Sequence, residues 1–173
     1  MQTKQLELIV ATESMLETIN SIYIRCRKQL EAEGILQWDD RYPNKEYFQQ
    51  CIDKNELYVL IRDEEILGHV VLNEFQDEEW NAVPWVGNKP LIIHSLMIDP
   101  EAQGGGLGGE FVKRCEQIAS DQGYDSIRLD AYLGNEKAVR LYKKLGYQLR
   151  GNIFFTTKPE GHQEYLCFEK QLS

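Results

Sequence analysis

The sequence lacks any clustering of the residues that build disulfide frameworks or zinc sites. Its four cysteines lie far apart and form no C-x-x-C pair: Cys26, Cys51, Cys115 and Cys167. Its three histidines show no metal-ligand spacing either: His69, His94 and His162. Both kinds of site are therefore poorly supported, and we expect a protein that needs no metal.

A long apolar run and an excess of positive charge are also missing. The opening residues, MQTKQLELIV, hold no apolar stretch of the length that a secretory signal needs, and no run elsewhere approaches a membrane span. The 19 Lys and Arg residues are outnumbered by 28 Asp and Glu residues, so the formal net charge is −9. Such a charge disfavours a nucleic-acid backbone as a partner. We expect a cytoplasmic protein that binds neither nucleic acid nor membrane.

What the sequence does contain is the composition of one globular domain. Hydrophobic residues make up 42% of the 173 residues and charged residues 27%, which is enough to bury a sizeable core. No internal repeat, low-complexity tract or linker divides the chain. We therefore predict a single domain over residues 1–173.

Apolar periodicity and turn residues predict an alternation of strands and helices. The first half is predicted to contain a strand over 6–11, helices over 14–33 and 44–54, and paired strands over 56–62 and 66–75. After a polar connection over 76–90, the second half is predicted to contain a strand over 91–98, a helix after the glycines, a strand over 125–132, a helix after Asn135, and strands over 147–155 and 164–172. This order is that of an α+β domain.

The stretch DPEAQGGGLGGEFV places five glycines within residues 104–109, between a predicted strand and a predicted helix. The first N–H groups of a helix have no partner within the helix, and the helix dipole favours negative charge there. Glycine lets a bulky phosphate reach those N–H groups and tolerates positive φ. We therefore predict that residues 103–109 bind a phosphate or pyrophosphate.

Two known phosphate motifs fit this stretch poorly. A P-loop needs a lysine and a hydroxyl residue after its last glycine, where this chain has Glu110 and Phe111. The dinucleotide fingerprint G-x-G-x-x-G matches from Gly104 onward, with Asp130 placed as a ribose-binding acid. However, DPEAQ separates the strand from the first glycine, several strands precede the motif, and few residues follow it. A nucleotide-binding oxidoreductase domain is therefore the weaker alternative.

A third pattern fits better. The run from Gln103 to Gly108, QGGGLG, matches Q/R-x-x-G-x-G/A and resembles the pyrophosphate loop of the GNAT superfamily of N-acetyltransferases. The run from Asn135 to Tyr147, NEKAVRLYKKLGY, is similar to a second pattern of that family, N-x-x-A-x-x-L-Y-x-x-L-G-F/Y. The two motifs and the order of elements cover roughly the whole chain, and residues 91–151 carry nearly all of the specificity.

The resemblance implies both a fold and an activity. The fold would have three layers, α/β/α, with a mixed, mostly antiparallel central sheet, about four helices, and a splayed pair formed by strands 91–98 and 126–132. The activity would be transfer of an acetyl group from acetyl-CoA to a primary amine of a small molecule or peptide, by direct attack in a ternary complex. A non-catalytic module that binds or senses acyl-CoA is the alternative, which the presence of Tyr142 and His94 disfavours.

For acetyl-CoA, the resemblance implies contacts from the strand before the loop, from the loop itself and from the second motif. These residues are Leu96, Met97, Ile98, Gln103, Gly104, Gly105, Gly106, Leu107, Gly108, Gly109, Asn135 and Tyr142. A strand N–H near Leu96–Ile98 would polarise the thioester carbonyl as an oxyanion hole does. Tyr142 would protonate the departing CoA thiolate or hold its sulfur.

The attacking amine must first lose a proton, because an aliphatic ammonium is mostly protonated near pH 7. His94 interrupts an apolar strand, and serotonin N-acetyltransferase-like members of the family place a histidine at the matching offset. Histone-type members carry a glutamate two residues earlier, where this chain has Ile92. We take His94 as the catalytic base, with Glu74 in reserve. The structural alternative is a histidine in the core or at a sheet edge.

In this superfamily the first two helices and the loop between them cover the acceptor side. The candidate walls for a cationic amine are Trp38, Asp39, Asp40 and Tyr42, with Trp80 and Trp85 as a lid. Trp38 and Tyr42 would equally serve to anchor the loop to the core. The resemblance also implies that the terminal hairpin, 147–156 with 163–170, can form a homodimer contact. The sequence identifies neither the acceptor nor the oligomeric state.

Overall fold

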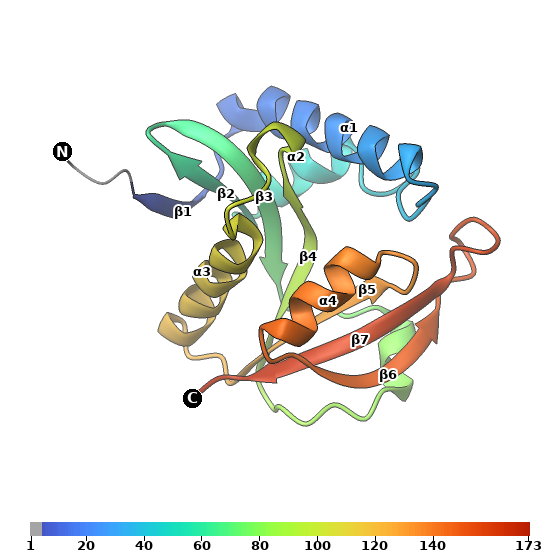
Figure 1. The fold of residues 1–173 in the computed structure, drawn as a ribbon. Helices are drawn as coiled ribbons and strands as arrows, with labels where there is room; N and C mark the ends of the chain where they lie inside the picture. Colours follow the sequence, from blue (N-terminus) through green and yellow to red (C-terminus); the bar gives the residue numbers. More distant parts are fainter. Residues whose placement is uncertain (1–4) are drawn as a thin grey trace. The chain divides into compact units, whose positions relative to one another are not determined.

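The structure is a computed structural model that describes residues 5–173, with seven strands, four α-helices and three short 3-10 helices (Figure 1). The strands follow the order β1-β2-β3-β4-β5-β7-β6. The chain divides into two compact units. The first holds the residues up to Glu33, Trp38–Leu72 and His94–Cys115, and the second holds Gly34–Gln37, Asn73–Ile93 and Glu116–Ser173.

The first unit contains an N-terminal strand, two helices, a hairpin and the part of the chain that carries the glycines. Its elements are β1 (Leu6–Val10), η1 (Glu13–Met15), α1 (Leu16–Ala32), α2 (Lys45–Asp53), β2 (Leu57–Arg62), β3 (Glu65–Asn73), the second part of β4 (Pro90–Ile98), η3 (Pro100–Ala102) and the first part of α3 (Leu107–Asp121). Asn44 caps α2 by accepting a hydrogen bond from the Tyr47 N–H at 2.9 Å. Asp63 and Glu64 turn the hairpin with φ of 51° and 68°, the left-handed values of a tight two-residue turn.

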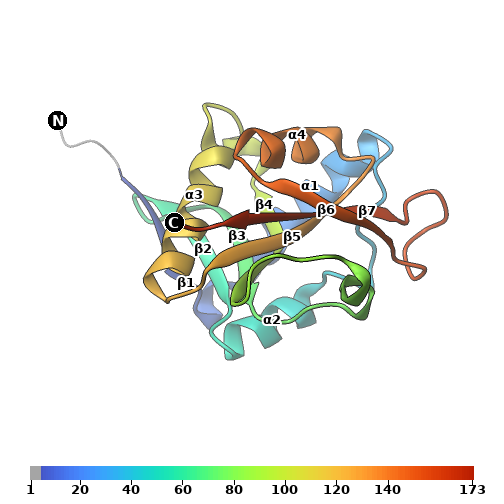
Figure 2. The same cartoon turned by 90° about the horizontal axis from the view of Figure 1, so that it is seen from below.

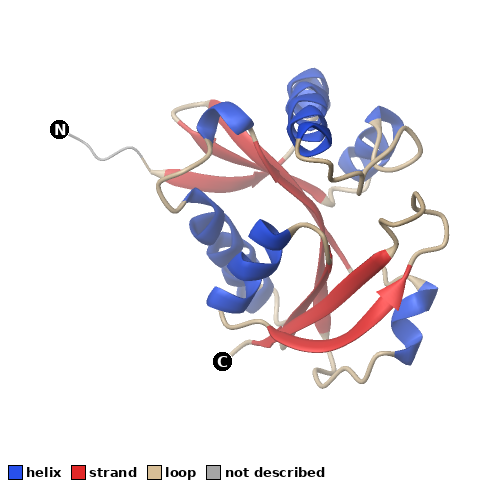
Figure 3. Ribbon diagram, turned by 45° about the vertical axis from the view of Figure 1, so that its right-hand side comes forward, coloured by secondary structure: helices blue, strands red, loops and turns tan. Residues whose placement is uncertain are grey.

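Within this unit, α1 and α2 pack on one face of the strands and α3 lies on the other (Figure 3). On β3, His69 faces α1, where its Nε2 pairs with the Ile19 carbonyl at 3.0 Å. The neighbouring Gly68 faces α3. A Cβ at Gly68 would lie 2.4 Å from the Met97 carbonyl oxygen and 3.0 Å from a ring carbon of Phe111. Gly68 is therefore required for the close packing of β3 against β4 and α3.

The second unit contains the first part of β4 and the C-terminal strands. Its other elements are η2 (Glu78–Ala82), the last part of α3, β5 (Ser126–Tyr132), α4 (Glu136–Lys144), β6 (Gln148–Phe154) and β7 (Glu164–Gln171). Strand β4 pairs with β5 in parallel over Pro90–Ile92 and Ser126–Arg128 only, in the described part of the chain. By contrast, β7 pairs antiparallel with both β5 and β6. The shortness of this parallel ladder agrees with the prediction that β4 and β5 form a splayed pair.

The two faces of this second sheet are covered differently. Helix α4 lies over one face, where Tyr142 contacts Phe168 of β7 with ring centroids 6.3 Å apart. The connection that holds η2 covers the other face (Figure 2). There the buried Trp80 packs with residues of β5 and β7 in an apolar cluster that includes Tyr132, Tyr165 and Cys167.

A buried ion network ties this connection to β5, β6 and β7. Glu169 of β7 is fully buried and accepts hydrogen bonds from Arg128 at 2.9 Å, from Arg150 at 2.8 Å and from the N–H groups of Val86 and Gly87 at 2.9 and 3.1 Å. Burial alone raises the pKa of Glu169, but these donors outweigh it and hold the pKa below its usual range. The carboxylate therefore stays charged at neutral pH, with both oxygens occupied.

The predicted fold class is confirmed: the sheet has seven strands, is mixed and mostly antiparallel, and is accompanied by four helices. The three 3-10 helices were not predicted, because elements of three to five residues carry no periodic pattern. Helix α3 begins at Leu107, inside the glycine stretch rather than after it. The single-domain organisation over residues 1–173 stays a prediction.

Candidate active site

The glycine-rich loop follows η3 and leads into α3. Gly104, Gly105 and Gly106 have φ of 107°, 62° and 77°, in the left-handed region that other residues rarely adopt. A Cβ added to any of the three would meet no atom within 4 Å. Glycine is therefore required at these positions by the backbone conformation and not by a lack of space. The space beside the three residues is open to a ligand.

The loop ends at the N-terminus of a long helix. The first hydrogen bond of helical length runs from the Glu110 N–H to the Gly106 carbonyl at 3.2 Å. The N–H groups of Gly108 and Gly109 precede that bond, at the end of the helix where N–H groups lack helical partners. An open loop in front of a helix start fits the predicted anion site.

Helix α1 holds the root of this loop. Arg25 donates two hydrogen bonds to Asp99, from Nη2 to Oδ2 at 2.7 Å and from Nε to Oδ1 at 3.1 Å. Asp99 also accepts from the Glu101 N–H at 3.1 Å, which caps η3. The Arg25 guanidinium holds the pKa of the Asp99 carboxyl below its usual range, so the pair stays charged at neutral pH. One turn further along α1, Gln29 Oε1 accepts from Gln103 Nε2 at 3.2 Å.

Strand β4 carries the candidate base and three predicted cofactor contacts. His94, Leu96 and Ile98 are partly exposed, and Met97 is buried. Ser95 has φ of 51°, an uncommon value for a residue other than glycine. Such backbone outliers cluster at functional sites. Sequence reasoning missed Ser95, because a serine in an apolar strand gives no signal of its backbone conformation.

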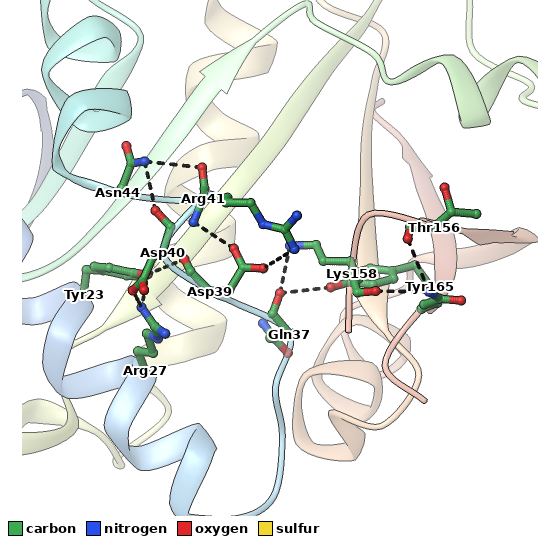
Figure 4. Close-up of polar contacts among 11 residues, drawn as sticks. Tyr23, Arg27, Gln37, Asp39, Asp40, Arg41, Asn44, Thr156, Lys158 and Tyr165 are labelled. Carbon is green, nitrogen blue, oxygen red and sulfur yellow. Dashed lines mark hydrogen bonds and ion pairs between the residues drawn. The ribbon is translucent and has the colours of Figure 1, made fainter. Parts of the chain in front are cut away.

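The loop after Gln37 is held to the first unit by many polar contacts (Figure 4). Tyr23 donates to the Asp39 carbonyl at 3.1 Å, and Arg27 Nη1 donates to Asp40 at 2.7 Å. Asn44 Nδ2 donates to the Asp40 and Arg41 carbonyls at 3.2 and 3.3 Å. The loop is therefore a fixed part of the first unit.

The two aromatic residues of that loop differ in their surroundings. Trp38 packs against the core formed by α1, α2 and the strands, with its ring centroid 6.0 Å from that of Tyr23. Tyr42 contacts Tyr47 at 4.9 Å, and its hydroxyl lies 3.2 Å from Ser95 Oγ. Trp38 thus packs on the core with part of its side chain exposed, whereas Tyr42 reaches the irregular part of β4.

In the second unit, Asn135 uses both ends of its side-chain amide. Its Oδ1 accepts from the Ala138 N–H at 3.3 Å and so caps α4, as predicted. Its Nδ2 donates to Gln37 Oε1 at 3.0 Å. The Gln37 carbonyl in turn accepts from Lys158 Nζ at 2.8 Å and from the Tyr165 hydroxyl at 3.4 Å. Gln37 was not predicted, because no local pattern links it to Asn135.

Tyr142, the predicted proton donor, lies on α4 and is 8% exposed. Its ring makes an edge contact with Tyr147 at 5.7 Å between centroids. Glu74, the reserve base, is exposed and accepts a hydrogen bond from the Tyr124 hydroxyl at 3.1 Å. Tyr142 is thus held by aromatic packing, and Glu74 is held at the surface of the second unit.

The prediction of Trp80 as part of a lid is wrong. Trp80 is 2% exposed, and its indole Nε1 donates to Asp130 Oδ2 of β5 at 2.9 Å. Trp85 packs against it with centroids 4.8 Å apart and ring planes tilted by 43°, and its Nε1 donates to the Trp80 carbonyl at 3.1 Å. The connection 76–90 is therefore packed onto β5, because its tryptophans bury their rings in the second unit.

Comparison with known proteins decides between the GNAT resemblance and the nucleotide-binding oxidoreductase domain. Residues 16–147 match the family described as "Acetyltransferase (GNAT) family". The chain belongs to this family. The matched range includes the glycine loop, His94 and the run that begins at Asn135. The GNAT resemblance predicted from two motifs is therefore confirmed, and the oxidoreductase alternative is set aside.

Two GNAT relatives illustrate how much of the chain is shared. The chain is 36% identical over 62 residues to the thialysine N-epsilon-acetyltransferase of Sus scrofa and 30% identical over 111 residues to N-acetyltransferase 8B of Homo sapiens. The matches cover 36% and 64% of this chain, and 36% and 45% of those proteins. The chain therefore spans less than half the length of these relatives.

Solved GNAT structures match the fold over nearly the whole chain. A GNAT acetyltransferase from Streptococcus agalactiae superposes with a TM-score of 0.83 at 21% identity and covers 99% of this chain and 98% of its own. The spermidine N-acetyltransferase of Vibrio cholerae, solved with CoA and spermine, has a TM-score of 0.70 at 18% identity and covers 96% and 95%. At these identities the likeness shows the fold alone.

Two absences hold for the described part of this GNAT chain. No helix within residues 5–173 is both long enough and apolar enough to cross a membrane. In the same range, no group of three or more His, Cys, Asp and Glu side chains gathers as a metal site would require. That the protein needs no metal stays a prediction.

Proposed function

We propose that this chain transfers an acetyl group from acetyl-CoA to a primary amine of a small molecule or peptide, by direct attack of the amine in a ternary complex. The observation that carries the proposal is the loop of three left-handed glycines, open beside each Cβ position, in front of α3. This arrangement suits the pyrophosphate of CoA, because N–H groups and helix dipole meet where no side chain intervenes.

Each predicted residue has a role in this proposal. Gln103 and the backbone of residues 104–109 hold the pyrophosphate, while Asn135 and the main chain of Leu96–Ile98 hold the pantetheine arm. A main-chain N–H of that strand polarises the thioester carbonyl. Tyr142 gives its proton to the CoA thiolate. Trp38, Tyr42 and Glu74 contact the acceptor.

The chemistry is a nucleophilic substitution at a thioester. The ammonium of the acceptor loses a proton, for which His94 is the proposed base. The amine lone pair then attacks the carbonyl carbon, and the C–S bond breaks as the thiolate leaves and takes a proton from Tyr142. The nitrogen releases its second proton to solvent as the amide forms, and solvent returns a proton to Tyr142. Only the neutral amine can attack, so rate should rise with pH through the pKa of the group that takes the proton.

The acceptor class is proposed from the relatives. By their names, one acts on thialysine and one on spermidine, and both are small molecules that carry amines. The negative charge of this chain, −9, is compatible with such cationic acceptors. We therefore propose a small cationic amine as the acceptor.

The first test is thermal unfolding with acetyl-CoA, free CoA and NAD added separately. A ligand at about a hundred times its dissociation constant adds about 2.7 kcal/mol to the native state. We expect both CoA species, and not NAD, to raise the unfolding midpoint. Thiol release with a panel of amines should then show turnover. Stabilisation by CoA without thiol release for any amine would favour the sensing module, and a shift with NAD alone would overturn the proposal.

Arg25→Gln is expected to raise KM for acetyl-CoA about threefold to tenfold, with a smaller change in kcat. The reason is that Arg25 fixes Asp99 at the root of the glycine loop, and such a change corresponds to a loss of about 0.7–1.4 kcal/mol of binding. Steady-state kinetics with acetyl-CoA varied at saturating amine measures it.

The matched control is Arg27→Gln on the same helix. Arg27 pairs with Glu31 and Asp40 at 2.7 Å each and makes no contact with the loop root. We expect this variant to leave KM for acetyl-CoA unchanged. Equal effects of the two substitutions on that KM would contradict the role given to Arg25.

Two further expectations stay predictions. A homodimer through the β6–β7 hairpin has in its favour that Leu149 and Phe154 of β6 are 50% and 57% exposed, and a size-resolved mass measurement tests it. The cytoplasmic location also stays a prediction.

A further inference from the structure

Ser95 lies where the backbone favours glycine. Its φ of 51° makes it, within residues 5–173, the one strand residue with a left-handed backbone. A side chain is strained in that region and glycine is not, and serine is not among the residues that are enriched there. What serine adds at this position is a hydroxyl, so the contacts of that hydroxyl indicate its use.

The Ser95 hydroxyl has room for a further hydrogen bond. In the described part of the chain its one hydrogen-bond partner is the Tyr42 hydroxyl, at 3.2 Å. A serine hydroxyl offers one proton and two lone pairs. Either hydroxyl can be the donor, and in both cases at least one lone pair of Ser95 Oγ is left for another donor. Ser95 is partly exposed, so a ligand from solvent can supply that donor.

Tyr42 is itself held in place. Its ring makes an edge contact with Tyr47 of α2, with centroids 4.9 Å apart and planes at 65°. Its hydroxyl lies 3.5 Å from the Tyr47 hydroxyl. The partner that orients the Ser95 hydroxyl is therefore fixed by a second aromatic ring.

Ser95 stands between the groups of β4 that the proposed reaction uses. His94, the proposed base, precedes it, and the main chain of Leu96–Ile98, proposed to polarise the thioester carbonyl, follows it. Successive Cα atoms are about 3.8 Å apart, and all of these residues belong to the first unit. An amine placed between His94 and the thioester is therefore beside Ser95.

The acids of the loop between α1 and α2 are already engaged by arginines. Asp39 accepts from Arg41 at 3.1 Å, and Asp40 accepts from Arg27 at 2.7 Å (Figure 4). A guanidinium beside each carboxylate opposes the binding of a second cation. A neutral hydroxyl also suits a reacting amine better, because a carboxylate stabilises the protonated form, which has no lone pair for attack.

We propose that Ser95 Oγ accepts a hydrogen bond from the acceptor amine, and that Tyr42 is the positioning residue that holds the Ser95 hydroxyl. The inference rests on the proposed function, since it adds a contact to the acceptor of that reaction. A primary ammonium carries three N–H groups, so one proton can pass to the base while another N–H is held by Ser95. The contact persists after this transfer, because the neutral amine keeps two N–H groups.

Steady-state kinetics tests the contact with spermidine, on which one relative acts by its name. Ser95→Gly and Ser95→Ala both remove the hydroxyl. Each should raise KM for spermidine about tenfold, the scale of a hydrogen bond to a charged group. Because the contact is made before and during attack, kcat should change less than about threefold, and KM for acetyl-CoA should stay within about twofold.

The matched control is Ser14→Ala in the same unit. Ser14 is exposed, and its Oγ lies 2.9 Å from Thr12 Oγ1, so this substitution also removes a serine hydroxyl that has one hydroxyl partner. Both KM values should remain those of the wild type.

A double-mutant cycle tests the role of Tyr42. Tyr42→Phe keeps the ring that packs on Tyr47 and removes the hydroxyl, so it should raise KM for spermidine about threefold. Adding Tyr42→Phe to Ser95→Ala should cause no further loss, because Tyr42 acts through Ser95. Effects that multiply would overturn the positioning role.

Unfolding measurements separate loss of the contact from loss of the fold. Glycine adopts the backbone of Ser95 without strain, so Ser95→Gly should unfold within about 3 °C of the wild type. Free CoA should raise both midpoints equally. Spermidine added with CoA should raise the wild-type midpoint further and that of Ser95→Gly less.

The outcomes distinguish this inference from the proposed function. A wild-type KM for spermidine in both Ser95 variants, or a loss in Ser95→Gly alone, would overturn the inference and leave the proposed function standing. If the wild type releases no thiol with any amine, the proposed function fails. A spermidine shift that needs Ser95 would then retain the amine contact, and the absence of that shift would reject it as well.

Discussion

Glu169→Gln is expected to lower the free energy of unfolding by about 3–5 kcal/mol, the cost of leaving buried charges without their partner. Glu169 is fully buried and joins Arg128 and Arg150 to the main chain at Val86 and Gly87. The amide cannot neutralise the guanidinium of Arg128, which is itself buried. Urea titration of the two proteins at pH 7 measures the difference.

The control and the pH dependence make this prediction specific. Glu164→Gln on the same strand loses a charge at the surface but keeps an amide oxygen to accept the hydrogen bond from Asn152, which is 3.0 Å long, and should cost less than about 1 kcal/mol. The folded-state pKa of Glu169 is lowered, so its contribution is present above the unfolded pKa and is lost as pH falls through the folded value. The gap between wild type and Glu169→Gln should therefore narrow in acid. A loss similar to that of Glu164→Gln would contradict the role of the network.

Tyr142→Phe is expected to lower kcat about 10²–10⁴-fold, the usual contribution of a positioned general acid. Under the proposed mechanism, the hydroxyl gives its proton to the thiolate as the C–S bond breaks. The ring remains, so its packing on Tyr147 and Phe168 is retained. Thiol release at saturating acetyl-CoA and amine measures kcat, and the unfolding midpoint should change little.

Tyr147→Phe is the matched control for this prediction. The two rings touch, and Tyr147 also loses one hydroxyl, which donates to Glu116 at 2.9 Å. This variant should lose about 1 kcal/mol of stability and keep its kcat. If Tyr142→Phe retained most of the wild-type kcat, the thiolate would leave without help from this hydroxyl, and water would be its proton source.

Much of the fold could be predicted because its signals are local. The caps Asn44 and Asn135 act within three residues of themselves, and apolar periodicity marks the long helices and strands. The start of α3 could not be predicted, since Gly108 and Gly109 are poor helix formers yet lie in its first turn. Tertiary packing of the following apolar residues overrides that propensity.

In the candidate site too, some residues could be predicted from local sequence and others could not. The glycine loop could be predicted because its residues are consecutive in the sequence. Its backbone conformation agrees with the expectation of positive φ. Arg25 and Asp99 are 74 residues apart, so no local pattern relates them. Asp130 and its partner Trp80 are 50 residues apart, so the sequence predicts Asp130 only as a ribose-binding acid and Trp80 only as part of a lid. The roles of His94 and Tyr142 stay predictions.

The conformation of Gly104–Gly106 separates two reasons for choosing glycine. Since a Cβ there would meet nothing within 4 Å, volume does not exclude a larger residue; the sign of φ does. A side chain of opposite chirality reverses that preference. The loop is therefore selected for the handedness of its backbone, and an L-alanine at any of the three positions would be strained. Among the amino acids that the ribosome incorporates, glycine is the one that adopts positive φ at three successive positions without steric strain.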